Sequence, residues 1–148
     1  MTAPLQAELD DALHAIVADM RAATAQLIIV LDEERKALNR ADAEALNRAG
    51  EAKQMLMRRL EQLDAERLHL SAASAHAAQT VNQAWNELLQ TLTDCRDKNQ
   101  RNGALVGQRL SQVRRALSVL TGTGHDSGIY GHSGTLRTVH RSLPLAEA

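Results

Sequence analysis

Aromatic residues are almost absent from this sequence. They make up 1% of its 148 residues, Trp85 and Tyr130 are the only two, and phenylalanine does not occur. The hydrophobic residues, 44% of the chain, are therefore mainly leucine and alanine, which are among the best helix formers. A chain of this length can form one domain with a useful core but is too short for two independent ones.

Cysteine is nearly absent as well. Cys95 is the only one, so no disulfide can form within the chain, and nothing indicates an oxidising compartment. A signal peptide needs a basic residue ahead of an apolar run, and the first five residues contain none. The longest purely aliphatic stretch, Leu27–Leu31, is far shorter than the roughly 20 residues that cross a bilayer. We therefore expect a cytoplasmic protein without membrane insertion.

Most helix-breaking residues lie near the ends of the chain. The two prolines are Pro4 and Pro144, and five of the eight glycines lie between residues 122 and 134. Between Leu5 and Leu120 almost nothing interrupts a helix. The expected fold class is all-α, an antiparallel bundle of three to four long helices with an extended C-terminal helix and a flexible tail.

Two amphipathic segments occupy the first half. The first has apolar residues at spacings that alternate between four and three, which is a heptad seam: Leu9, Leu13, Ile16, Met20, Ala23, Leu27 and Val30. The second has a helical apolar face: Leu46, Ala49, Ala52, Leu56, Leu60 and Leu63. We expect helices at about 4–39 and 42–70, with Thr2 and Asp42 as N-caps and Ser71 or Ser74 as the N-cap of the next helix.

The third segment is the most regular. Its heptad positions are Val81, Trp85, Leu88, Leu92, Cys95, Asn99, Asn102, Val106, Leu110, Val113, Leu117 and Leu120. The phase passes unbroken through Asn102-Gly103, a pair that otherwise favours a turn, so one helix is predicted over about 75–121. Gly122 and Gly124 would end it. Residues 1–121 are expected to form the helical bundle, and 122–148 a flexible Gly/Ser/His-rich tail.

Charge is divided between the two parts of the chain. Residues 1–100 contain 11 Lys/Arg and 16 Asp/Glu, a balance of -5, whereas residues 101–148 contain 6 and 2, a balance of +4. The basic part could meet an acidic partner. Its arginines are spread over some forty residues, too thinly for a nucleic-acid patch, so no nucleic-acid partner is expected.

No arrangement of reactive residues predicts an enzyme. Glu66-Arg67-Leu68-His69 has the Glu-x-x-His spacing of di-metal bundles, but such sites need a second copy, which the sequence lacks. Cys95 lies on the apolar face, where a packed and unreactive thiol is expected. We expect no catalytic activity, no metal and no cofactor.

Two asparagines interrupt the seam of the third segment. Asn99 and Asn102 stand where leucine is expected, and a buried amide must be paired. Gly103 and Gly107, one turn apart, would let another helix approach closely. Two interpretations stay open at this point: a specific docking role, or a helix that has left its own bundle and is solvated here.

The apolar stripe continues beyond the asparagines. Its members are Val106, Leu110, Val113, Leu117 and Leu120. The third predicted helix is longer than the first two, so part of it could extend past them and offer an apolar face to a partner helix. The alternative is that the stripe packs on the bundle itself or on the second copy of a homodimer.

The second half of the chain resembles the FlgN family of flagella synthesis proteins. The resemblance lies in residues 99–106, Asn-Gln-Arg-Asn-Gly-Ala-Leu-Val, followed by an amphipathic helix and a tail with Ile129-Tyr130-Gly131 and Gly134. In that family an Asn-x-x-Asn-Gly segment opens the last stretch of a long C-terminal helix. Trp85 also fits the family pattern, whereas residues 1–80 match only as heptad helix.

The resemblance implies a chaperone for the hook-associated proteins FlgK and FlgL, delivered to the flagellar type III export apparatus. It implies that the C-terminal helix binds the helical C-terminal region of those subunits, which assigns partner contacts to Asn99, Asn102, Gly103, Val106, Leu110, Val113, Leu117 and Leu120. It also implies that Tyr130 and Gly131 dock on the export gate protein FlhA.

Two other classes of function are open to the residues alone. One is a structural homo-oligomer or adaptor whose third helix pairs with its twin. The other is a helical nucleic-acid-binding regulator that uses the arginines of the basic part, Arg109, Arg114, Arg115, Arg137 and Arg141.

Overall fold

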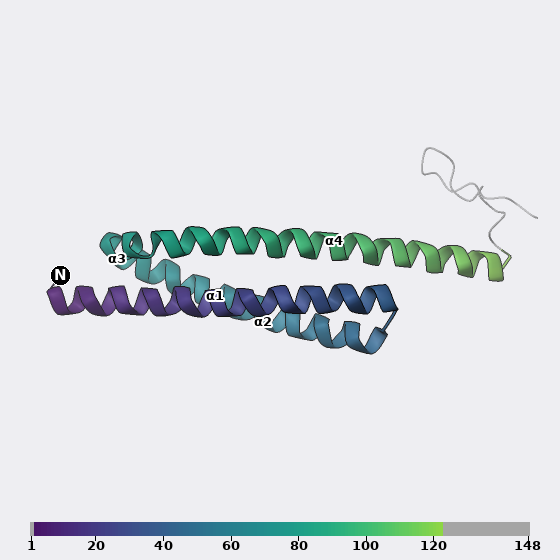
Figure 1. Cartoon of the computed structure of the whole chain (residues 1–148), viewed down its shortest axis with the longest axis horizontal. Coiled ribbons are helices and arrows are strands. Elements are labelled where there is room, and N and C mark those ends of the chain that lie inside the picture. The colour runs from purple at the N-terminus through teal and green to yellow at the C-terminus, as the bar shows by residue number, and fades with distance from the viewer. Residues whose placement is uncertain (1, 123–148) are drawn as a thin grey trace, which may run out of the picture. The chain divides into compact units, whose positions relative to one another are not determined.

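A computed structural model describes residues 2–122 of the chain. These residues form four helices and no strand: α1 (Ala3–Arg40), α2 (Ala43–Ala73), α3 (Ala75–Thr80) and α4 (Asn82–Leu120) (Figure 1). The expected all-α fold class is confirmed. The tail predicted over 122–148 lies outside the described residues, apart from Gly122.

The described residues divide into two units at Val106 and Gly107, and α4 contributes to both. The first unit thus ends earlier than the bundle expected over 1–121. Burial gives the reason. In α4, Leu88, Cys95 and Asn102 are buried, whereas no residue from 107 to 122 is.

Local hydrogen bonds define the helix ends. The Asp42 carboxylate accepts from the backbone N–H of Ala45 at 3.0 Å, and the Ser74 hydroxyl accepts from that of Ala77 at 3.1 Å, so both are N-caps as predicted. The side chain of Thr2, in contrast, makes no capping bond at the start of α1. Only its backbone carbonyl takes part, accepting from the N–H of Gln6 at 3.0 Å.

The prediction of a single helix over 75–121 is wrong, because the helix is interrupted at Val81, between α3 and α4. Val81 has φ −98° and ψ 1°, outside the helical range, and is 4% exposed. It is buried with Leu13, Val17 and Ala77, so tertiary packing overrides the local pattern. The helix restarts at once, since the N–H of Trp85 donates to the carbonyl of Val81 at 2.8 Å. The apolar period therefore continues across the break, which hides it in the sequence.

The core of the first unit is a series of apolar clusters along α1. The first joins α1 to the α3 region: Leu13, Val17, Ala77 and Val81. The second joins α1, α2 and α4: Met20, Leu63 and Leu88. The third adds Leu27, Leu31 and Cys95. Residue numbers rise together in α1 and α4, so these helices are parallel, and α2 runs antiparallel to both (Figure 1).

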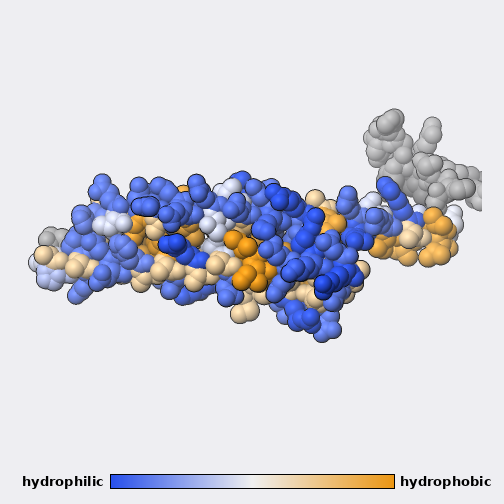
Figure 2. Space-filling view, viewed as in Figure 1, coloured by the Kyte–Doolittle hydropathy of each residue, from blue (hydrophilic) through white to orange (hydrophobic). Residues whose placement is uncertain are grey.

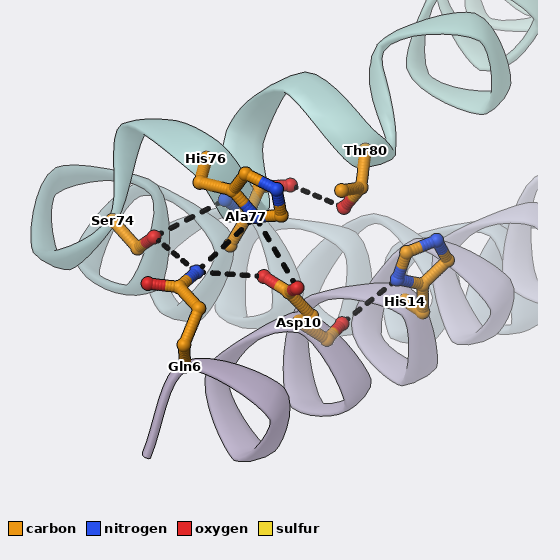
Figure 3. A network of polar contacts seen from close by, with 7 residues as sticks. All are labelled: Gln6, Asp10, His14, Ser74, His76, Ala77 and Thr80. Atoms are coloured by element: carbon orange, nitrogen blue, oxygen red, sulfur yellow. Dashed lines mark hydrogen bonds and ion pairs between the residues drawn. The ribbon is translucent and has the colours of Figure 1, made fainter. Parts of the chain in front are cut away.

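A polar network fixes the junction of α2 and α3 to α1 (Figure 3). The side-chain amide of Gln6 donates to the Ser74 hydroxyl at 2.8 Å and to the Asp10 carboxylate at 3.0 Å. Asp10 also lies 3.3 Å from the ring of His76. The short connection between the two helices is thus held by side chains from the first turns of α1.

Candidate partner-binding face of helix α4

A buried polar layer lies in the first unit beyond the third apolar cluster. Its centre is the Glu34 carboxylate, 6% exposed, which accepts from the Lys53 ammonium at 2.7 Å and from the Asn102 amide at 2.8 Å. The same amide donates to the Leu31 carbonyl at 2.9 Å. Charge and hydrogen bonds are thus satisfied together, as a buried carboxylate requires. The layer joins α1, α2 and α4.

This layer gives the two seam asparagines different surroundings within the described chain. Asn102 is 4% exposed, and its side-chain N–H groups donate to two acceptors inside the first unit, so it does not lie on open surface. Asn99 is exposed and accepts from Lys53 at 3.1 Å. Asn102 thus pairs a buried carboxylate, as a buried seam amide requires, and this pairing holds the register of α4 against α1.

Glu34 and Lys53 were not identified from the sequence. A signal was present for Glu34, because it follows Val30 by four residues and so occupies the next seam position of α1. An acidic residue in a seam predicts a buried polar partner. Lys53 gave no comparable signal.

The first unit also contains Gly103 and Val106 from the predicted partner surface. A Cβ built on Gly103 would meet no atom within 4 Å, and Val106 is 37% exposed. Both therefore lie on open surface. Trp85 instead belongs to the core, where it packs on the second apolar cluster with the Arg67 guanidinium 3.8 Å from the centre of its ring.

The second unit presents the remaining members of the predicted surface, which we call the distal stripe: Leu110, Val113, Leu117 and Leu120. Each is at least half exposed, at 51%, 55%, 54% and 81% respectively. At about 100° per residue the four side chains fall within about 80° of the helix circumference. The C-terminal part of α4, green in Figure 1, accordingly shows much hydrophobic surface in Figure 2. Such a face, exposed on a regular helix, is suited to bind another amphipathic helix.

The one cysteine of the sequence, Cys95, is free and buried. Burial raises the pKa of the Cys95 thiol above its ordinary value, with a smaller contribution in the same direction from Asp94. Its thiol faces the carbonyl of Thr24 at 3.9 Å and lines an apolar hollow of about 330 Å³. Residues 2–122 hold no cluster of three His, Cys, Asp or Glu side chains that could bind a metal.

By length and composition, α1 is the one helix among the described residues that could cross a membrane, and 39% of its most apolar 18-residue segment is buried. This is weak evidence, because the core helix of a soluble bundle passes the same test.

Within the described residues, the arginines of the basic part do not lie on one face of α4. Arg109 and Arg115 are six residues apart, which places them about 120° apart around α4. Tyr130, Gly131, Arg137 and Arg141 lie outside the described residues.

Residues 2–122 form an all-helical protein with a packed bundle and an apolar face of α4 that is exposed within these residues. The FlgN protein family matches residues 1–138. The chain therefore belongs to the FlgN family, which makes it a chaperone of flagellum biogenesis. No curated protein matches it. No solved structure matches it either.

Proposed function

We propose that this chain is a cytoplasmic export chaperone that binds the C-terminal helical region of the hook-associated proteins FlgK and FlgL. It prevents their premature self-association and delivers them to the flagellar type III export gate. The observation that supports the client site is the exposure of the distal stripe on a regular helix. Membership of the FlgN family supports the class of client.

The binding mechanism is mass action on a segment that is disordered before assembly. Such a segment exposes apolar positions that would otherwise associate with other subunits, and an apolar helix face covers them. Ordering the segment consumes part of the interaction free energy, so moderate affinity is expected, which permits release at the gate.

Delivery is assigned to the C-terminal tail. We place the contact with the export gate protein FlhA at Tyr130 and Gly131, on the family resemblance of the Tyr-Gly element. Client binding by α4 and gate docking by the tail would then be separable by substitution.

Purified chain mixed with purified FlgK or FlgL tests the proposal, with complex formation followed by size-exclusion chromatography and light scattering. We expect a complex with at least one subunit and slower self-association of that subunit. A stable homodimer of the chain that ignores both subunits would instead support the structural homo-oligomer.

A further inference from the structure

The apolar distal stripe has a cationic border. At about 100° per residue, Arg109 lies about 20° outside the edge of the stripe formed by Leu120, and Arg114 lies about 40° outside the edge formed by Leu110. Arg115 lies about 180° from the centre of the stripe. Two of the three arginines of this segment therefore flank the apolar face, one on each side.

These arginines have no internal role among the described residues. No hydrogen bond or ion pair holds a guanidinium group of Arg109, Arg114 or Arg115 within residues 2–122, and all three are exposed. Several arginines of the first unit, in contrast, pair with carboxylates: Arg21 with Glu87, Arg48 with Glu44, Arg59 with Asp19 and Arg67 with Asp64.

Two ordinary explanations for charge on a helix do not apply here. Cations near a helix C-terminus can stabilise its dipole, but the last turn of α4 contains no basic residue. Arginines also form pairs at helical spacing, but residues 107–122 contain no Asp or Glu. Among residues 2–122, the border is thus positive charge without a carboxylate partner, beside apolar surface.

We propose that the occupant of the distal stripe is an amphipathic helix with carboxylate side chains along both borders of its apolar face. The inference rests on the proposed function and specifies the chemistry of its client. Apolar contact supplies most of the affinity, and the paired borders select acidic-flanked helices and reject basic-flanked ones.

Single charge reversals test this inference with a matched control. Arg109→Glu, Arg114→Glu and Arg115→Glu change the charge of the full chain equally, and only the third lies away from the stripe. Titration of FlgK or FlgL at about 50 mM salt should show binding about 3- to 10-fold weaker for the first two variants and within about twofold for the third. The differences should shrink at about 300 mM salt, because exposed charges are screened.

Equal losses in all three variants, or no loss in any, would overturn the acidic border. If the unaltered chain binds neither subunit, the proposed function fails, and the charge inference is then tested with two synthetic helical peptides. These share one leucine stripe and carry either Glu or Lys along both borders. The inference requires at least about tenfold tighter binding of the Glu peptide at low salt, and a preference reduced by Arg109→Glu but not by Arg115→Glu. Equal binding of both peptides would refute it.

Discussion

Val113→Asp tests whether the distal stripe holds the client, and Val119→Asp is its matched control. Val113 is 55% exposed and lies within the stripe, whereas Val119 is 75% exposed and lies about 140° from the stripe's centre. Both substitutions place the same carboxylate at an exposed position of α4. The control lies in the last turn, where a negative charge costs the helix about 0.3–1 kcal/mol, so it bears more of any helix fraying than the test variant.

The magnitude follows from the exposure of Val113. A client that covers the exposed half of this side chain gains about 1 kcal/mol from its burial. A carboxylate in the same place loses that gain and is desolvated without a partner, which costs about 1–3 kcal/mol more. The sum of about 2–4 kcal/mol corresponds to binding weaker by about 30- to 1,000-fold. Leu117→Asp should behave in the same way, since Leu117 is 54% exposed in the same stripe.

Isothermal titration of FlgK or FlgL into each variant measures the effect, and circular dichroism checks that helix content is retained. We expect Val119→Asp to bind within about threefold of the unaltered chain. Affinity of Val113→Asp within that same range would show that the client binds elsewhere. Equal damage by both variants would show that fraying of α4, rather than loss of the stripe, weakens binding.

Four further predictions concern single residues. Asn102→Leu should lower the free energy of unfolding by about 1–3 kcal/mol in a denaturant titration, because the buried carboxylate it binds loses a donor. Ala41 has φ 54° at the end of α1, so Ala41→Gly should raise the free energy of unfolding by about 0.5–1 kcal/mol, whereas Ala65→Gly inside α2 should lower it by a similar amount. Burial raises the pKa of Cys95 above its ordinary value of 9.0, so the native thiol should contain less thiolate at pH 8 than a free cysteine. The rate at which a thiol reagent labels it should therefore still increase above pH 9, and should increase sharply when the protein unfolds. Tyr130→Ala should reduce binding to FlhA and leave client binding intact; parallel loss of both would contradict separate sites.

The heptad pattern predicted the helices well where one face meets one neighbour. The seam of α1 is buried at five of its seven predicted positions, and Asp42 and Ser74 cap the starts of α2 and α3. The heptad pattern predicted too narrow a buried face for α1, however. Val17, Thr24 and Leu31 are also buried, because α1 packs against both α2 and α4 and needs a wider apolar face than a single seam.

The break at Val81 and the burial of Asn102 could not be predicted in the same way. The break keeps the helical phase, so periodicity contains no trace of it, and only the packing of Val81 on α1 reveals it. Asn102 is a polar residue at a seam position, and whether it is buried depends on a hydrogen-bond partner from a distant part of the sequence. A lone seam asparagine is compatible with either solvent or a buried acceptor.

The sequence by itself determined the all-helical class, the approximate helix limits, the apolar face of α4 and, through the residues around Asn99 and the tail, the family. These features depend on local spacing, which each segment contains whether or not it is folded. Tertiary structure decided which α4 residues of the first unit are buried, because Leu88, Cys95 and Asn102 meet residues of α1 that are distant in the sequence. It also decided that Asn102 donates a hydrogen bond to Glu34, since these residues are 68 positions apart in the chain and meet only when α1 and α4 pack.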